Sequence, residues 1–421
     1  MAIAAGAGSE LEQRVRASVE LQLAGRLGDR ASTRVSLADQ DWVYQMVGRV
    51  VAEEHRLAGL SAQAEDSAAL WRRVFGAVTP LGPLAEHLVD PDCEEIRING
   101  TRTCFVLRGG RRFQVPSPFA DEEALVELVH WYTDGAGTAR LDRSSPMVTL
   151  TLPDGSRLHA ALSPPARPLS VTIRRHVPSR FRDLSDLATA GFLPATVIPF
   201  LEAVIRGRLN VLVAGGTGTG KTTFVRVLCR LIPDSERLVT IEDQAELHLW
   251  QDLPDCVSLE ARAPNTEGRG EIGIQQLVRE ALRMSPDRIV IGEVRGAEAL
   301  DLLDAMNTGH PGSVCTIHSE SPRDTLPRLS RLALRNPAAP RPEAISAEIG
   351  RTVDLVLHLG VSSRDGLRQR QLRSIGLVRD QGAGQPVVED LGGVDAIPDR
   401  VAAKLEAAGF DPGLLVELGR G

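Results

Sequence analysis

Hydrophobic and polar residues follow different patterns in successive parts of the 421-residue chain. Between about residues 9 and 77, apolar residues recur three and four positions apart, as in SLADQDWVYQMVGRVVAEEH, which predicts two or three amphipathic helices. The next part carries short strand-like runs such as EEIRING and MVTLTLPDGSRLHAAL, which Gly, Pro and Asp turns separate. One helical stretch, FADEEALVELVHWYTDGAG, interrupts these runs, so this part predicts a small α+β domain.

The second half of the chain alternates helices with uninterrupted apolar runs. A polar, proline-marked stretch leads into the helix LPATVIPFLEAVIRGR, which is followed by the runs NVLVAG, RLVTIED, RIVIGE and SVCTIHS. Such runs joined by helices are typical of a parallel sheet covered on both faces. We therefore expect a helical segment at 1–77, an α+β domain at 78–176, a linker at 177–187, an α/β domain at 188–360, and a polar, irregular C-terminal extension at 361–421 that ends in a short helix.

Composition and charge exclude several classes of function. Hydrophobic residues make up 43% of the chain, but the sequence contains no run of about 18 apolar residues, the length that a membrane-spanning helix requires. A net charge of −7 argues against a general nucleic-acid coat protein, because neutralising phosphates requires a positive face. The five cysteines lack disulfide or zinc spacing, and the N-terminus does not look like a secretory signal. We expect a cytoplasmic protein.

One lysine stands out, because all but two of the 48 basic residues are arginines. Lys221 lies in VAGGTGTGKTTFVRVL, where Gly215, Gly220, Lys221 and Thr222 fit the pattern G-x-x-x-x-G-K-[ST] between a strand and a helix. In such a loop, backbone N–H groups and the helix N-terminus surround phosphates, and the lysine reaches the β and γ phosphates as a compact charge. The hydroxyl of Thr222 is a candidate ligand of Mg²⁺. The loop therefore predicts a nucleotide site.

Carboxylates end two of the apolar runs. Glu242 and Asp243 end RLVTIED, and Glu293 ends RIVIGE. In a parallel sheet both strand ends meet at the edge where the phosphate loop lies. Each acid alone could instead cap the following helix, but together they favour a site that orients water and Mg²⁺ for hydrolysis.

Residues of two further kinds have open roles. His310 and His318 flank the run SVCTIHS, and each is either a packed side chain or a sensor of phosphate. Arg157 and Arg174 lie on strand-like runs of the α+β domain, where they are either surface residues or cations that reach a nucleotide held elsewhere.

The order of the motifs GGTGTGKTT, TIEDQAEL, EGRGEI and LRMSPDRIVIGEVRGAEALDLLDAMNTGHPGSVCTIHS resembles the type II/IV secretion ATPase superfamily. It is most similar to the CpaF/TadA branch, the motors of Tad (Flp) pili. The resemblance runs from about residue 79 to 359 and implies a hexameric ring of subunits. Each subunit would have a mobile N-terminal domain linked to a RecA-like C-terminal ATPase domain, with ATP between them.

The resemblance also assigns roles to individual residues. Glu242 would be the base for water within an aspartate box that includes Asp243, and Glu293 would act on Mg²⁺ through its water shell. His310 and His318 would form a histidine box that relays the state of the γ-phosphate, and Arg157 and Arg174 would reach the nucleotide. ATP and Mg²⁺ are the implied ligands, and the implied nucleotide-binding loop consists of Gly215, Gly216, Thr217, Gly218, Thr219, Gly220, Lys221, Thr222 and Thr223.

The resemblance implies a motor that drives an inner-membrane platform and associates with the inner face of the membrane through partners. A second hypothesis is a DNA-handling or conjugation-type ring ATPase, which the negative charge and the 4% aromatic content disfavour. A third is a regulatory protein that binds ATP without turnover, and the presence of both Glu242 and Glu293 argues against it.

Overall fold

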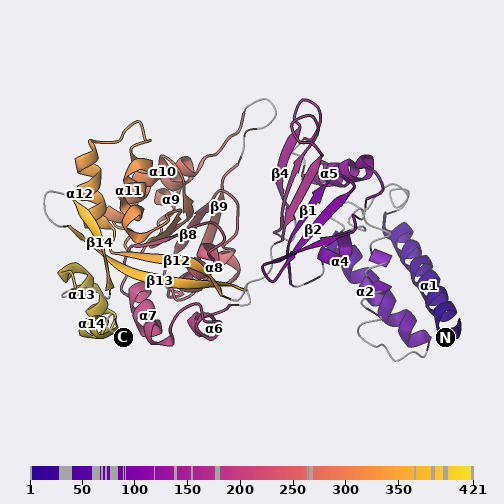
Figure 1. Cartoon of the computed structure of the whole chain (residues 1–421), viewed down its shortest axis with the longest axis horizontal. Coiled ribbons are helices and arrows are strands. Elements are labelled where there is room, and N and C mark those ends of the chain that lie inside the picture. The colour runs from indigo at the N-terminus through magenta and orange to yellow at the C-terminus, as the bar shows by residue number, and fades with distance from the viewer. Residues whose placement is uncertain are drawn as a thin grey trace. The chain divides into compact units, whose positions relative to one another are not determined.

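A computed structural model describes residues 2–27, 40–58, 67, 70–71, 74–75, 84–88, 90, 92–117, 119–136, 140–152, 155–175, 181–262, 264, 269–364, 367–380, 385–391 and 397–418. The chain divides into two compact units, Met1–Pro178 and Ser179–Gly421 (Figure 1). The predicted linker at 177–187 begins outside the described residues. Among the described residues, no helix has both the length and the apolar character that crossing a membrane requires.

The first unit begins with two helices that pack on each other. α1 (Ala2–Leu27) and α2 (Gln40–Leu57) bury apolar residues at helical spacing, such as Val15 and Val19 on α1 and Val43 and Val47 on α2. The helical pattern of this segment is confirmed for the residues described. The cluster forms a core of its own, separate from that of the sheet that follows.

The rest of the first unit is an antiparallel sheet with one long helix. The strand order is β3-β2-β1-β6-β5-β4. Ile96 and Ile98 are buried while Arg97 between them is exposed, because successive side chains of a strand point to opposite faces. The predicted α+β architecture is confirmed by α4 (Ala85–Leu88), β1 (Cys93–Asn99), β2 (Thr103–Arg108), β3 (Arg111–Val115), α5 (Glu122–Ala136), β4 (Met147–Thr151), β5 (Arg157–Ala161) and β6 (Ser170–Arg174).

The second unit is built on an eight-stranded sheet of order β14-β13-β12-β7-β11-β10-β8-β9. The pairs from β12 through β9 are parallel, and β13 and β14 are antiparallel additions at one edge. The four predicted apolar strands are all present. The whole sheet consists of β7 (Val211–Gly215), β8 (Leu238–Glu242), β9 (Cys256–Glu260), β10 (Arg288–Val294), β11 (Val314–Ile317), β12 (Leu355–Arg364), β13 (Leu367–Asp380) and β14 (Pro386–Asp390).

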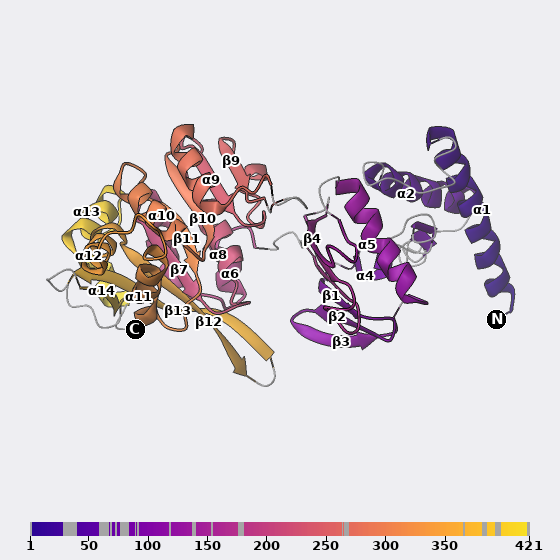
Figure 2. The ribbon, with the colours of Figure 1, turned by 90° about the horizontal axis from the view of Figure 1, so that it is seen from above.

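Helices cover both faces of this sheet, which explains why its central parallel strands are apolar (Figure 2). Val211 and Val213 contribute to one buried cluster, and Leu212 and Ala214 contribute to the other. The first cluster includes residues of α6 (Leu184–Thr189), η4 (Ala195–Val197), α7 (Ile198–Arg206), α8 (Lys221–Cys229), η5 (Leu249–Gln251), α13 (Asp399–Ala407) and α14 (Gly413–Leu418). The second includes residues of α9 (Ile274–Ala281), η6 (Leu282–Met284), α10 (Glu298–Asn307), α11 (Pro322–Ala333) and α12 (Pro342–Thr352).

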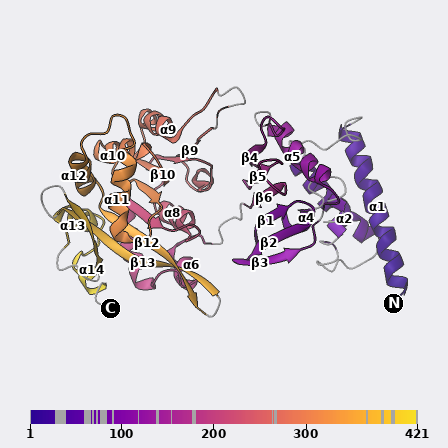
Figure 3. The same cartoon turned by 45° about the horizontal axis from the view of Figure 1, so that its top comes forward.

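The expected irregular extension after residue 360 was wrong. β12 and β13 form a long hairpin whose free end projects from the sheet (Figure 3), and β14 pairs with β13. The sequence LRQRQLRSIGLVRD hid this strand, because only its second half is buried, at Ile375, Leu377 and Val378. The predicted terminal helix is confirmed as α13.

The second lysine of the chain fixes α13 to the sheet. Lys404 Nζ donates to Asp354 Oδ2 at 2.6 Å, and Arg400 Nε lies 3.2 Å from Asp354 Oδ1. Asp354 is 1% exposed and also accepts the backbone N–H of Asn210, at the start of β7. A buried carboxylate needs such partners, since an unpaired charge in the interior is costly.

Candidate nucleotide-binding site

The loop between β7 and α8 has the backbone that its glycines predict. Gly218 and Gly220 have φ values of 74° and 93°, in the left-handed region where a side chain is strained. At Gly215 a Cβ atom would lie 2.6 Å from the carbonyl oxygen of Leu359 on β12. The loop can therefore turn tightly against the neighbouring strand, and α8 begins directly at Lys221.

Lys221 folds back over this loop. Its Nζ donates to the carbonyl oxygens of Gly215 at 3.0 Å and Gly216 at 2.9 Å, and it lies 3.5 Å from Nδ1 of His318. The side chain is buried, and burial lowers the pKa of Lys221 although the nearby carboxylate of Glu293 opposes the shift. The ammonium group therefore lies near the N-terminus of α8, where a bound phosphate would also interact with the N-terminal N–H groups of the helix.

Glu242 is held at the end of β8. Its carboxylate is 3% exposed and accepts the backbone N–H groups of Glu246 and Leu247, each at 3.1 Å to Oε1. Burial raises the pKa of Glu242 to about 7, although the two backbone hydrogen bonds act in the opposite direction. Gly292 on β10 makes room for it, because a Cβ there would lie 2.9 Å from Glu242 Cγ.

Glu293 on β10 belongs to a second, more polar group. Arg295 Nη2 donates to Oε2 of Glu293 at 2.8 Å, and Nε2 of His318 lies 3.1 Å from Oε1. Burial alone would raise the pKa of Glu293, but Arg295, His318 and Lys221 outweigh it and the pKa is lowered. Arg295 also reaches Asp243, at 3.4 Å.

His318 lies between Lys221 and Glu293. One ring nitrogen faces Lys221 and the other faces Glu293. Burial and the charge of Lys221 lower the pKa of His318, while Glu293 acts against them. A neutral imidazole is therefore favoured, which can connect the lysine to the carboxylate through its two nitrogens.

Thr222 has a partner that the sequence reasoning missed. Its Oγ1 donates to Oε2 of Glu246 at 3.1 Å. Glu246 and Arg295 lie in TIEDQAEL and GEVRG, after the apolar runs, so the residues that end those runs did not indicate them.

The donors near the loop fit Mg²⁺ held together with a nucleotide. No group of three His, Cys, Asp or Glu side chains that could hold a metal occurs among the residues described. Mg²⁺ commonly takes one or two protein oxygens and completes its shell with phosphates and water. The Thr222 hydroxyl beside the Glu246 carboxylate, with Glu293 on the neighbouring strand β10, matches that requirement.

His310 lies at the edge of the sheet that the amino ends of the strands form, opposite the edge that carries the loop. β7 and β11 run parallel, with Val211 beside Val314 and Ala214 beside Ile317, so His318 follows the end of β11 that lies near the loop while His310 precedes the other end. Four strand residues at about 3.3 Å each separate the two ends by roughly 13 Å. The structure therefore does not bring His310 to Lys221, and a contact of His310 with phosphate stays a prediction.

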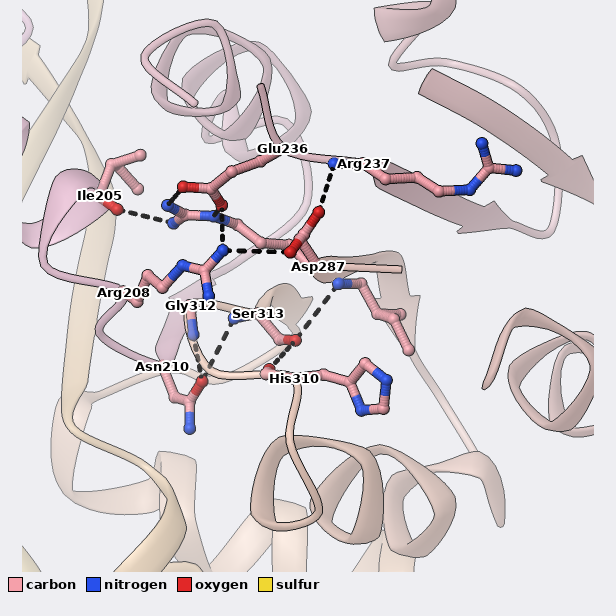
Figure 4. A network of polar contacts seen from close by, with 11 residues as sticks. Ile205, Arg208, Asn210, Glu236, Arg237, Asp287, His310, Gly312 and Ser313 are labelled. Atoms are coloured by element: carbon pink, nitrogen blue, oxygen red, sulfur yellow. Dashed lines mark hydrogen bonds and ion pairs between the residues drawn. The ribbon is translucent and has the colours of Figure 1, made fainter. Parts of the chain in front are cut away.

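His310 instead belongs to a polar network at that edge (Figure 4). Its carbonyl oxygen accepts the hydroxyl of Ser313, and Asn210 Oδ1 accepts the N–H groups of Gly312 and Ser313. The fully buried Arg288, at the start of β10, is bound there by Glu236 at 2.6 Å and 3.0 Å. These contacts fix the amino ends of the strands whose carboxyl ends carry the site.

Arg157 and Arg174 lie in the first unit, directly opposite each other on β5 and β6. Like charges in that position repel. Within the described residues neither guanidinium makes a hydrogen bond or ion pair, whereas Glu95, the neighbour of Arg174 on β1, pairs with Arg97. The pair is thus a local concentration of positive charge, and its contact with a nucleotide stays a prediction.

Comparisons with known proteins place this arrangement in context. A family profile described as "Type II/IV secretion system protein" matches residues 80–382. The chain is similar to Rv3659c of Mycobacterium tuberculosis (strain ATCC 25618 / H37Rv), provisionally named a conjugal transfer protein, with 39% identity over 277 residues, 64% of this chain and 76% of the relative. Protein VirB11 of Agrobacterium fabrum (strain C58 / ATCC 33970) is 34% identical over 274 residues, 58% of this chain and 76% of the relative.

Solved structures agree on the fold. The ATPase DotB of Legionella pneumophila matches with a TM-score of 0.51 at 22% identity, over 72% of this chain and 81% of that protein. This likeness supports the architecture, an N-terminal domain followed by a RecA-like domain.

Proposed function

The chain belongs to the type II/IV secretion system protein family and is an ATPase of that family, and on this premise we propose that it is a motor for pilus assembly or secretion. In the form that the motifs favour, it would hydrolyse ATP as a homohexameric ring that drives a Tad/Flp-type pilus. It would act from the cytoplasm on proteins of an inner-membrane platform. A conjugation-type motor is the second candidate, because relatives such as Rv3659c are named for conjugal transfer.

One observation carries the proposal of hydrolysis. Lys221, Glu242 and Glu293 come from separate elements, and each is positioned by other parts of the same unit. A loop that only binds a nucleotide needs the lysine but has no use for a buried carboxylate whose pKa is near neutrality. A general base works best when its pKa is close to the working pH.

The residues then divide the work as follows. Lys221 exchanges its two carbonyl partners for the β and γ phosphates, and Glu242 accepts a proton from the attacking water. Thr222, Glu246 and Glu293 would hold Mg²⁺, which supplies charge neutralisation on the phosphates when bound. Because His318 contacts both Lys221 and Glu293, it is placed to respond when phosphate displaces either contact. Arg157 and Arg174 would supply positive charge to the nucleotide from the first unit.

The experiment compares phosphate release and ATP binding for the wild-type protein, Lys221→Ala and Glu242→Gln. Loss of ATP binding in Lys221→Ala and loss of phosphate release with binding retained in Glu242→Gln are expected. Normal hydrolysis by Lys221→Ala would refute the site, whereas normal hydrolysis by Glu242→Gln would refute only the choice of base. Measuring the particle mass with and without nucleotide tests the ring, and salt-dependent DNA binding by the wild-type protein would favour the second candidate.

A further inference from the structure

The hairpin of β12 and β13 reaches the phosphate loop. Leu359 of β12 pairs with Gly215 of β7 on one side and with Leu372 of β13 on the other. β7 ends at Gly215, but the hairpin continues, with Val361 paired to Arg370. Two residues of strand beyond Leu372 correspond to roughly 7 Å, so Arg370 lies level with the loop that follows β7.

Arg370 makes a direct contact there. Its Nε donates to the carbonyl oxygen of Gly218 at 2.9 Å, and its Cδ would lie 3.6 Å from a Cβ on Gly220. A backbone hydrogen bond holds β13 in place beside the loop, since the N–H of Leu372 donates to the carbonyl oxygen of Phe192 at 2.7 Å. The contact joins residues 152 positions apart in the sequence.

The planarity of the peptide bond gives this contact a consequence. In a trans peptide the C=O of one residue and the N–H of the next point in opposite directions. A bond that holds the Gly218 carbonyl toward the hairpin therefore turns the N–H of Thr219 away from the hairpin. Gly218, with its φ of 74°, is a residue with unusual freedom to rotate this peptide, so the loop itself constrains it weakly.

We propose that Arg370 is a positioning residue of the phosphate loop: by holding the Gly218 carbonyl it presents the Thr219 N–H to the bound phosphates. The inference rests on the proposed function, because it requires that the loop bind a nucleotide. It also makes the hairpin part of the nucleotide site, so that a displacement of β13 would loosen the grip on phosphate.

The test uses the full-length protein and four variants. Arg370→Ala removes the donor, Arg370→Lys and Arg370→Gln keep an N–H donor with and without charge, and Arg373→Gln removes an exposed arginine from the same strand as the matched control. Calorimetry gives the Kd for Mg-ADP, steady-state kinetics give KM and kcat for ATP, and the Tm without nucleotide checks the fold.

For Arg370→Ala, a rise of about three- to tenfold in Kd and KM is expected, with little change in kcat or Tm, because one exposed hydrogen bond is lost. Both Arg370→Lys and Arg370→Gln should fall between Arg370→Ala and the wild type, and Arg373→Gln should match the wild type. Binding by Arg370→Ala that equals the Arg373→Gln control would overturn the inference. So would a Gln variant as weak as the Ala variant beside a normal Lys variant, since that pattern indicates a direct charge contact. A wild-type protein that binds no nucleotide would overturn the proposed function itself.

Discussion

Replacing Glu242 by Gln should change how the stability of the protein depends on pH. The carboxylate is 3% exposed, and its pKa of about 7 compares with an ordinary value of 4.5. Between these two values the folded protein keeps a proton on Glu242 that the unfolded chain has released. The free energy of unfolding therefore falls as the pH rises from about 4.5 to 7, and the loss is complete above the folded pKa.

The size of this effect follows from the shift. About 2.5 pKa units at 1.36 kcal/mol each amount to roughly 3 kcal/mol, of which about 2.5 kcal/mol falls between pH 5 and pH 8. Gln stays neutral and can still accept an N–H group from Glu246 or Leu247. The Tm of Glu242→Gln relative to the wild type should therefore rise between pH 5 and 8, by roughly 5–10 °C for a unit of this size.

Scanning calorimetry at pH 5, 6, 7 and 8 measures this difference in Tm. Asp243→Asn is the matched control, because it removes one charge from the adjacent, exposed side chain. A difference between Glu242→Gln and the wild type that stays constant from pH 5 to 8 would show that Glu242 does not titrate there, and the argument for a neutral-pH base would fail. The same pKa predicts that phosphate release by the wild type rises with pH through about 7, since the base must be ionised.

Three other changes separate roles that the structure assigns to different places. Gly292→Ala should displace the Glu242 carboxylate and lower the phosphate-release rate at least tenfold while the Kd for ATP stays near the wild-type value; unchanged turnover would refute the close packing at 2.9 Å. His318→Ala should lower the rate of phosphate release, whereas His310→Ala should leave the Kd for ATP unchanged. Normal phosphate release by His318→Ala together with weaker ATP binding by His310→Ala would contradict the separation along β11. Asp354→Ala should destabilise the second unit by about 3 kcal/mol in urea titrations, because it removes a buried carboxylate that pairs with Arg400 and Lys404 and accepts the buried N–H of Asn210; a loss below about 1 kcal/mol would count against the anchoring of α13.

The sequence predicted the second unit well because its strands are buried on both faces. Uninterrupted apolar runs such as the one ending at Gly215 have few alternatives to a parallel strand between helices. The glycines of the phosphate loop also predict a turn that other residues adopt only with strain, and the acids that end RLVTIED and RIVIGE indicate the carboxyl ends of two strands. Local patterns were enough for these features.

What the sequence could not predict depends on contacts between distant residues. β13 has a polar first half since that half projects beyond the sheet, and polar alternation of this kind looks the same as a loop. The contact from Arg370 to Gly218 spans 152 positions and lies on that misread strand. His310 and His318 flank one run, and the resemblance assigned both to one histidine box, although the two ends of a parallel strand lie at opposite edges of the sheet.

The two central carboxylates illustrate why the surroundings, and not the residue type, decide the chemistry. Both are glutamates at the ends of neighbouring strands of one sheet, β8 and β10, so residue type and strand position alone do not distinguish them. Burial raises the pKa of Glu242 despite its two backbone N–H partners, while Arg295, His318 and Lys221 lower the pKa of Glu293. Environments that push two pKa values apart assign a proton acceptor and a permanent anion. Of these two carboxylates, Glu242 is the one suited to exchange a proton at neutral pH, so the two sets of neighbours support the proposed division between a base and a Mg²⁺-facing acid.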